Sequence, residues 1–293
     1  MKLYIKGYKS MREDFAVFIL SNRRADSVTT LESLQKSGYT GKWYIIVDNE
    51  DDTVYNYIEK YGEDHIIIFD KSIAAEMTDT CENSGKRGAV VFARNMCFKI
   101  AEQLGVKYFL ELDDDYVRFE YRYEEDKKLM TYMITDFNSV VDEMIDFLDT
   151  SGALTVAFSQ GGDFIGGADS QNFRKKIVRK AMNSFFCSAD RPFKFFGLIN
   201  EDVNTYVTLG CRGDLFLTYS PLSLIQGVTQ RNTGGLTDIY LDLGTYQKSF
   251  YSVMCSPSCV KISMMGDKHQ RMHHLVNWEA CSPKIISEEF KKR

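Results

Sequence analysis

The sequence predicts an α/β fold, a single domain in which a mostly parallel sheet is flanked by helices. Short apolar runs alternate with segments of helical periodicity, and several of these runs end in polar turns. The chain of 293 residues is also long enough to bury a large core. Strands that alternate with helices in this way build a parallel sheet with right-handed crossovers, and ligands bind beyond the carboxyl ends of its strands. The polar turns occupy those ends and are therefore expected to line one crevice.

The first strand is expected at 15–20, FAVFIL, because a continuous apolar run is typical of a strand buried on both faces. It ends at the polar turn 21–26, SNRRAD. A helix follows, with apolar residues spaced by three, and Gly38 is expected to close it.

The second strand is expected at 42–48, KWYIIVD, and it leads into the acidic turn 48–52. A helix then ends at Gly62, and the third strand occupies 65–70. The segment 85–105 is expected to be a glycine-flanked loop that runs into a long helix.

The fourth strand, within 107–115, delivers Asp113, Asp114 and Asp115 to a strand end. Like charges at a buried edge repel one another, and a hard cation with oxygen ligands, Mg²⁺ or Mn²⁺, would offset that repulsion. Alternating side-chain direction puts Asp113 and Asp115 on one face, and Glu111 is expected to be a structural partner. A solvated acidic turn is the alternative interpretation.

The second half of the chain has a different character. It is expected to contain a helix at 130–152, a strand that opens into a glycine-rich loop at 153–167, and strand-like stretches at 177–187 and 214–220. No repeat, low-complexity tract or linker interrupts the sequence, which favours one domain with two subregions.

Composition excludes several classes of protein. No apolar run approaches the roughly 20 residues of a membrane span, and the N-terminus lacks the apolar region of a secretory signal. A cytoplasmic location is therefore expected.

The net charge of −5 counts against a general attraction to polyanions. The basic stretch 174–180, RKKIVRK, with Arg191, Lys194, Arg212 and Arg231, is either a local anion-binding patch or a solvated face.

Seven cysteines are scattered along the chain, and only Cys255 and Cys259 lie close together. Their spacing is too wide for the usual paired zinc ligands, and no second pair accompanies them. The sequence therefore predicts reduced, mostly structural thiols.

Five segments together resemble the GT-A glycosyltransferases: FILSNRR, IIVDNED, GAVVFARN, ELDDDY and GLINEDVNTY. Two further stretches, GGLTDIYLDLGTYQKSFYSVMCSPSCVKI and RMHHLVNW, look like the phage TET-associated glycosyltransferases that modify 5-hydroxymethylpyrimidines in DNA. The resemblance implies a GT-A-like domain over 1–293. Its Rossmann-like half, 12–118, would bind the nucleotide sugar, and 119–293 would bind the acceptor and end in a segment that closes the metal and donor site.

The resemblance also implies which residues hold the donor, a UDP-sugar. They are Ser21, Asn22, Arg23, Arg24, Asp48, Arg94, Asn95, Asp113 and Asp114. A strand-tip aspartate such as Asp48 can accept hydrogen bonds from a uracil N–H or a ribose hydroxyl. Arg94 can offer a planar fork of donors to phosphate, or it can instead pair with Asp113 or Asp48 beneath the crevice.

By the same resemblance, Mn²⁺ or Mg²⁺ would bridge the two phosphates of the donor. The implied ligands are Asp113, Asp115, His273 and His274. An exposed face with unligated histidines is the alternative for the last two.

Asp202 would be the general base, with Glu201 beside it, in a single-displacement reaction that inverts the anomeric centre. Helix capping explains the same residues without catalysis, because Asn200 could cap a helix whose first turn favours carboxylates.

Three functions remain open from the sequence. The leading hypothesis is an inverting, metal-dependent transferase that moves a sugar from a UDP-sugar to a hydroxymethylated pyrimidine in DNA, in the host cytoplasm if the chain is phage-encoded. The acceptor could instead be a glycan, a lipid or a protein hydroxyl. A nucleotide-sugar-binding or nucleotidyltransferase-like protein is the third possibility. The oligomeric state and the identity of the sugar do not follow from the sequence.

Overall fold

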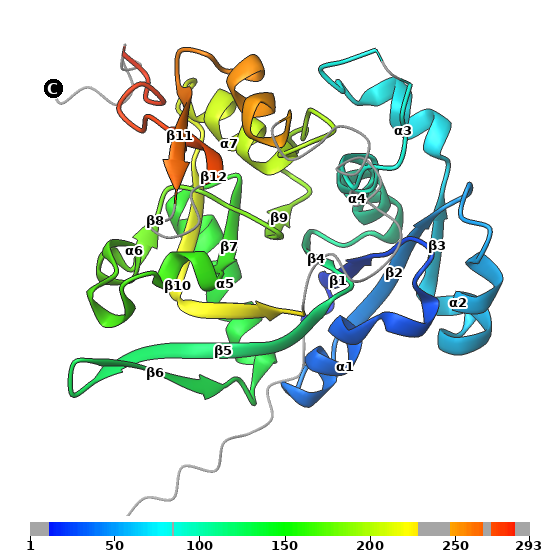
Figure 1. Cartoon of the computed structure of the whole chain (residues 1–293). Coiled ribbons are helices and arrows are strands. Elements are labelled where there is room, and N and C mark those ends of the chain that lie inside the picture. The colour runs from blue at the N-terminus through cyan, green and yellow to red at the C-terminus, as the bar shows by residue number, and fades with distance from the viewer. Residues whose placement is uncertain (1–11, 84, 228–246, 266–270, 285–293) are drawn as a thin grey trace, which may run out of the picture.

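The computed structural model of the protein describes residues 12–83, 85–227, 247–265 and 271–284 (Figure 1). Strands and helices alternate through the N-terminal half. In order they are β1 (Phe15–Leu20), α1 (Thr29–Lys36), β2 (Lys42–Asp48), α2 (Val54–Tyr61), β3 (Ile66–Phe69), α3 (Lys71–Met77), α4 (Val91–Leu104) and β4 (Tyr108–Asp113).

The second half of the chain adds more strands than helices. In order the elements are β5 (Tyr116–Glu125), β6 (Lys128–Met133), α5 (Phe137–Ser151), β7 (Thr155–Ser159), α6 (Gln171–Lys175), β8 (Ile177–Val178), β9 (Ser184–Ser188), α7 (Glu201–Gly210), β10 (Phe216–Gln226), β11 (Val260–Met265) and β12 (Arg271–Val276). Residues 247–255 are also helical.

One large sheet runs through the molecule with the strand order β3-β2-β1-β4-β9-β7-β10-β5-β6, and β8 pairs with β10. Strands β1 to β4 pair in parallel, as does β10 with β7, whereas β9, β5 and β6 join in antiparallel pairs. The α/β class predicted from the sequence is confirmed. Among the described residues, β11 and β12 form a separate antiparallel hairpin.

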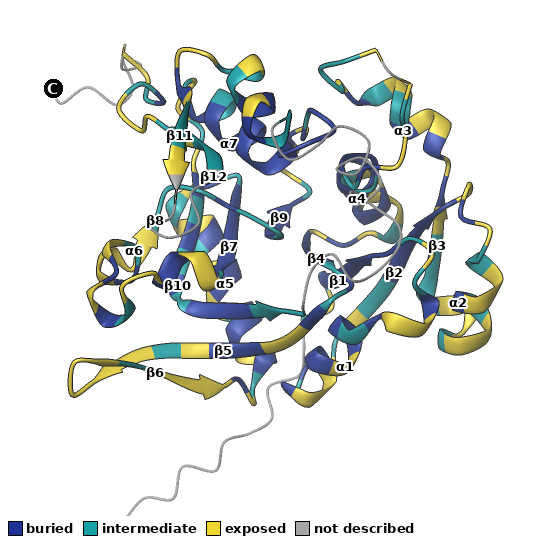
Figure 2. Cartoon of the chain, viewed as in Figure 1, coloured by how far each residue is buried: buried dark blue, intermediate teal, exposed yellow. Residues whose placement is uncertain are grey.

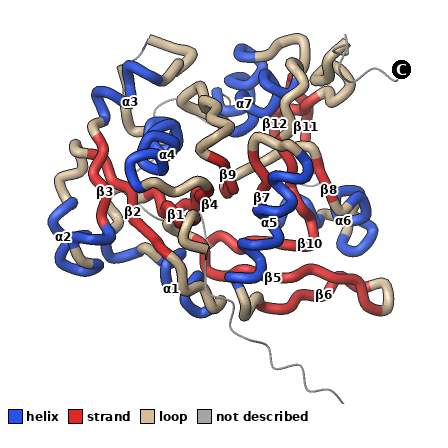
Figure 3. The backbone as a smooth tube through the Cα atoms, turned by 180° about the vertical axis from the view of Figure 1, so that it is seen from behind, coloured by secondary structure: helices blue, strands red, loops and turns tan. Residues whose placement is uncertain are grey.

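The two faces of the sheet are buried by different helices. Alternate residues of β1 point to opposite faces, so Ala16, Phe18 and Leu20 pack with α4 and α7, whereas Val17 and Ile19 pack with α1 and α5. Figure 2 shows the central strands as buried and the β6 arm as exposed. Figure 3, from behind, shows α5 beside β7.

The predicted helix at 130–152 is wrong in its first part. Residues 128–133 form β6, which pairs with β5 in a hairpin whose turn has Asp126 and Lys127 at positive φ. The helix starts at Phe137, where the side chain of Asp136 accepts a hydrogen bond from the Ser139 backbone N–H. The β5–β6 hairpin was not predicted, because its strands carry alternating charged and aromatic residues instead of an apolar run.

Gly38 closes α1 as the sequence predicts. Its φ of +82° is a left-handed conformation that favours glycine, and a Cβ there would lie 2.5 Å from the Thr135 carbonyl oxygen. The glycine therefore allows the end of α1 to approach the segment that precedes α5.

None of the helices in the described ranges combines the length and the apolar character that a membrane span requires. All seven cysteines lie in the described residues as free thiols.

Candidate active site

The polar turns after β1, β2 and β4 meet at one edge of the sheet, as the strand order predicts. Ser21, from the first turn, donates a hydrogen bond from Oγ to Oδ2 of Asp114 at 2.6 Å. Asn22 donates from Nδ2 to Asp48 Oδ2 at 3.0 Å, which joins the first turn to the second. The three turns are therefore joined to one another by side-chain hydrogen bonds.

Helix α1 holds the backbone of the acidic turn in place. The hydroxyl of Thr30 donates to the Asp113 carbonyl oxygen at 2.6 Å and accepts from the Tyr116 N–H at 2.9 Å. The backbone N–H of Thr30 donates to the Asp114 carbonyl oxygen. The side chains of the aspartate triplet are therefore presented from a rigid turn.

Asp114, expected to bind the donor, faces the protein interior. It is 4% exposed, and its two carboxylate oxygens accept from Ser21 and, at 3.1 Å, from Arg24 Nη1. Desolvation raises the pKa of this carboxyl above its usual range. Asp114 thus joins the first turn to β4.

Two residues that the sequence did not indicate complete this part of the site. The Tyr57 hydroxyl lies 2.8 Å from Ser21 Oγ and accepts from the backbone N–H of Arg24 at 2.7 Å. Lys71, the first residue of α3, donates to Asp48 Oδ2 at 3.0 Å and is buried. Both lie on short helices, and their partners are distant in the sequence.

Arg23 is the exposed residue of the first turn. Its backbone N–H donates to Asp51 Oδ2 at 2.7 Å, and its guanidinium pairs with Asp52 at 3.1 Å, where both side chains are more than half exposed. The side chain of Arg23 therefore lies on the solvent side of the first turn.

Arg94 of α4 is the central cation of the site and is 1% exposed. Its Nη2 donates to Asp113 Oδ1 at 3.0 Å, and its Nε donates to Glu201 Oε1 at 3.1 Å. Its Nη1 lies 3.6 Å from Glu111 Oε2. Of the two roles left open by the sequence, the observed contacts match pairing to Asp113 instead of exposure to a phosphate.

Glu111 is fully buried, and desolvation raises its pKa to about 8 despite the opposing charge of Arg94. At neutral pH this carboxyl is therefore mostly protonated. The carboxylates that balance the charge of Arg94 are those of Asp113 and Glu201. Glu111 is a structural partner, as the sequence predicts.

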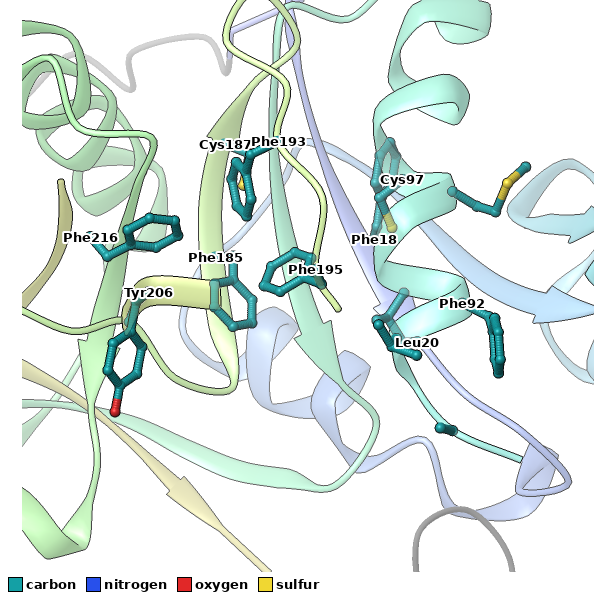
Figure 4. Close-up of a cluster of buried hydrophobic side chains, with 14 of the residues drawn as sticks. Phe18, Leu20, Phe92, Cys97, Phe185, Cys187, Phe193, Phe195, Tyr206 and Phe216 are labelled. Atoms are coloured by element: carbon teal, nitrogen blue, oxygen red, sulfur yellow. The ribbon is translucent and has the colours of Figure 1, made fainter. Parts of the chain in front are cut away.

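Aromatic rings confine the Arg94 guanidinium. Its central carbon lies 4.7 Å from the ring centroid of Phe185 and 5.9 Å from that of Phe195. Figure 4 shows Phe195 between Phe185 and the part of the core formed by α4 and β1. The side-chain amide of Asn95 donates to the Phe195 carbonyl and to the Thr78 hydroxyl, and it accepts from the Phe195 N–H. This amide therefore positions the loop that carries Phe195.

Asp115 has the least protein contact of the triplet. Its carboxylate accepts from Gln226 Nε2 at 3.1 and 3.2 Å, and Gln226 is a partner that the sequence did not indicate. Desolvation, followed by the charge of Asp113, raises the pKa of Asp115 to about 6. Among the described residues, the side-chain hydrogen bonds to this carboxylate therefore come from one neutral amide.

The first turn of α7 carries Glu201 and Asp202, both buried. Asn200 does not cap this helix, because its side chain makes no capping hydrogen bond and instead donates to the Lys248 carbonyl and to Ser252 Oγ. Desolvation, then the neighbouring Glu201, raises the pKa of Asp202 to about 7. The interpretation of Asn200 as a helix cap is therefore wrong. The carboxyl of Asp202 has a pKa close to neutral pH.

His273 and His274 lie on β12, with ring centroids 4.3 Å apart. Burial lowers the pKa of His274 to about 4, and His274 Nδ1 is buried without a hydrogen-bond partner. Among the described residues these rings do not join Asp113 and Asp115 in a set whose ligand atoms lie within 4.8 Å of one another. The four-ligand metal set expected from the sequence is not assembled in this structure.

The basic residues divide into exposed and internal groups. Lys175 and Lys176 are exposed at the end of α6, as are Lys194 and Arg212. Lys180, in contrast, pairs with Asp163 at 2.5 Å. A second group of four uses its donors in contacts within the protein: Arg174, which is itself exposed, Arg179, Lys180 and Arg191. Arg231 lies outside the described residues, as does most of the stretch GGLTDIYLDLGTYQKSF.

Comparisons with known proteins identify what this chain is similar to. The model of the family described as TET-Associated Glycosyltransferase matches residues 15–235. Among solved structures, glucosyl-3-phosphoglycerate synthase from Mycobacterium tuberculosis, in complex with Mg²⁺ and uridine diphosphate, is 12% identical, covers 89% of this chain and 87% of its own, and has a TM-score of 0.44. S. aureus TarS is 13% identical, with 83% of this chain and 42% of its own covered, and a TM-score of 0.42. No curated protein matches the chain.

Proposed function

The chain belongs to the TET-associated glycosyltransferases, and on that premise we propose that it moves a sugar from a UDP-sugar to a hydroxymethylated pyrimidine base in DNA. The proposal includes a bound Mn²⁺ or Mg²⁺ and inversion at the anomeric carbon. The enzyme class follows from the family, whereas the donor, the metal and the acceptor are the proposal.

The observation that carries the proposal is the bridge that Arg94 makes between the acidic turn and α7. Through Asp113 and Glu201, one buried guanidinium links the expected metal-binding turn to the helix that carries the expected base. Transfer requires the diphosphate of the donor and the acceptor hydroxyl to meet at one carbon, so both groups of residues must belong to one site.

The acidic turn suits a hard divalent cation. Asp115 offers a carboxylate with few protein contacts, and Asp113 lies beside it, as the charge effect on Asp115 indicates. Carboxylate oxygens are the ligands that Mg²⁺ and Mn²⁺ prefer. When bound, the cation would neutralise the charge that develops on the departing diphosphate.

The uridine side of the donor would lie against the turns after β1 and β2. Asp48 is fixed by Asn22 and Lys71, so its carboxylate keeps one orientation at the strand tip. Asp48 Oδ1 accepts from the Glu50 N–H and retains a second lone pair for a uracil N–H or a ribose hydroxyl. Arg23, exposed on the first turn, would contact a phosphate of the donor.

Asp202 would accept the proton of the acceptor hydroxyl as its oxygen attacks the anomeric carbon. A base works best when its pKa lies near the working pH, and the pKa of Asp202, raised to about 7, meets this condition. Glu201 serves a positioning role, because its carboxylate is held by Arg94.

The support for a DNA acceptor consists of the family and a few exposed cations, chiefly Lys175 and Lys176. A pyrimidine inside a duplex would be extruded or approached through the groove for its hydroxymethyl group to reach Asp202.

The test is a transfer assay with Mn²⁺, a panel of UDP-sugars and DNA that contains 5-hydroxymethylcytosine, followed by digestion to nucleosides and mass spectrometry. A nucleoside heavier by one sugar residue, with release of UDP, supports the proposal. Release of pyrophosphate, or transfer only to glycan or peptide hydroxyls in parallel reactions, overturns it.

A further inference from the structure

Three cysteines that are far apart in the sequence meet beside the C-terminal end of α7. They are Cys211, Cys259 and Cys281, and their sulfur atoms all lie within 4.8 Å of one another. Cys259 and Cys281 are buried, and Cys211 is partly exposed. Among the described residues this is the one group of three or more candidate ligand atoms with such spacing.

The spacing of the sulfur atoms matches tetrahedral metal coordination. A Zn–S bond of about 2.3 Å places two sulfur ligands of a tetrahedral site roughly 3.8 Å apart. The Cys211 and Cys259 sulfur atoms are 3.4 Å apart, and the Cys281 sulfur lies within 4.8 Å of both, so changes in separation of at most about 1 Å would complete the site. A disulfide, by contrast, needs about 2.05 Å and would leave the third thiol unpaired.

Each cysteine comes from a different part of the C-terminal region. Cys211 is the C-cap residue of α7, Cys259 directly precedes β11, and Cys281 follows β12. The backbone reinforces this grouping, because the Asn277 N–H donates to the Cys259 carbonyl at 2.7 Å and the Cys281 N–H donates to the Asn277 carbonyl at 3.1 Å. A metal here would fasten both ends of the β11–β12 hairpin to α7.

A cation beside the group would balance the charge of three thiolates. Arg179 donates to the carbonyl oxygens of Gly210 and Cys281 and, at 2.8 Å, to Ser282 Oγ. Three thiolates on Zn²⁺ carry a net charge of −1. The guanidinium of Arg179, which is hydrogen-bonded to the Cys281 carbonyl, offsets this charge.

We propose that Cys211, Cys259 and Cys281 bind Zn²⁺ as three protein ligands that fasten the β11–β12 hairpin to α7, with water as the fourth ligand beside the partly exposed Cys211. Binding releases the three thiol protons, because the thiolate is the form that coordinates the metal. Soft sulfur ligands select zinc over Mg²⁺ and Mn²⁺, so this site is chemically distinct from the acidic turn.

The proposal is independent of the transferase reaction and concerns the hairpin that carries His273 and His274. Spacings of 48 and 22 positions separate the three cysteines in sequence, so no short motif indicates the site. The proposal gives three of the thiols expected to be mostly structural a role as metal ligands.

The test uses tag-free full-length protein, purified under reducing, anaerobic conditions with zinc in the growth medium and analysed by elemental mass spectrometry. An equimolar zinc content is expected for the wild type and for the control variant Cys255→Ser, whose thiol lies outside the group. Cys211→Ser, Cys259→Ser and Cys281→Ser should each lose most of the zinc.

A second measurement avoids dependence on variants that fail to fold. Titration of the zinc-free wild type with Co²⁺ should produce thiolate-to-cobalt absorption and the visible bands of tetrahedral cobalt. Bound zinc should also protect these three cysteines from iodoacetamide. Reduced wild-type protein with neither zinc nor the cobalt bands overturns the proposal, as does equal zinc content in a variant with all three cysteines replaced by serine.

Discussion

Arg94 Nε donates to Glu201 Oε1 at 3.1 Å, and this contact joins α4 to the first turn of α7 across 107 positions of the sequence. The same guanidinium holds Asp113 at the end of β4. The relative placement of the acidic turn and α7 therefore depends on a buried cation and its carboxylate partners.

Replacement of Arg94 should destabilise the fold. Arg94→Met leaves Asp113 and Glu201 without their cation, and an uncompensated buried charge of this kind costs about 3–5 kcal/mol. Chemical denaturation of wild type and variant at one pH measures the difference. Glu111→Gln is the matched control, because Glu111 is mostly protonated at pH 7, and a change of similar size in both variants contradicts the assigned charge balance.

Metal binding should depend on the ionisation of Asp115. The pKa of this carboxyl, raised to about 6 in the folded protein, means that protons compete with the cation below that pH. Manganese affinity, measured by titration calorimetry with UDP present, should fall by roughly tenfold for each pH unit below 6.

The variant Asp115→Ala should lose metal-dependent UDP binding and turnover, whereas Asp146→Ala, which removes an exposed carboxylate from α5, should retain both. Wild-type activity in Asp115→Ala would exclude this carboxylate as a ligand.

The transfer rate should follow the titration of Asp202. Because the base acts in its deprotonated form, the rate should rise with pH and level off above about 7. Asp202→Asn should keep UDP-sugar binding and lower the transfer rate by about 10²–10⁴-fold. Wild-type transfer in Asp202→Asn, under single-turnover conditions, would reduce this residue to a structural role.

Three buried or partly buried carboxyls, those of Asp115, Asp202 and Glu111, should make the free energy of unfolding decline as pH rises. The pKa values of Asp115, Asp202 and Glu111 are all raised in the folded protein, to about 6, 7 and 8. At these three carboxyls the folded state therefore binds more protons than the unfolded state between about pH 4 and 8, whereas His274, whose pKa is lowered to about 4, opposes the effect below about pH 6.5. Their favourable contribution is fully present below the unfolded pKa values near 4 and is lost as pH passes 6 to 8, which thermal unfolding across this range measures.

Charge reversal at Lys175 and Lys176 should weaken DNA binding. Each lost phosphate contact makes the slope of log K against log salt concentration less steep by about 0.9. Fluorescence anisotropy with a labelled duplex at several salt concentrations measures this slope. Hydrolysis of the UDP-sugar without acceptor should not change, and an equal loss in both assays would mean that the variant is misfolded.

Much of the fold follows from local sequence patterns, because apolar runs such as 15–20 and glycine-closed helices need no distant partner to be recognised. The β5–β6 hairpin does not follow, since each of its strands is amphipathic only in the context of the other. For the site, the acidic turn and the Glu201–Asp202 pair can be predicted from the strand order and the motif resemblance. Tyr57, Lys71 and Gln226 cannot, because each acquires its role from one hydrogen bond to a residue far away in the chain.

The claim that a divalent cation and a diphosphate bind at the end of β4 is tested most directly by anomalous diffraction. Crystals soaked with MnCl₂ and UDP should show a manganese peak within coordination distance of Asp115, with density for the diphosphate beside it. An acidic turn without a manganese peak in fully soaked crystals, with UDP bound elsewhere or absent, would contradict the account.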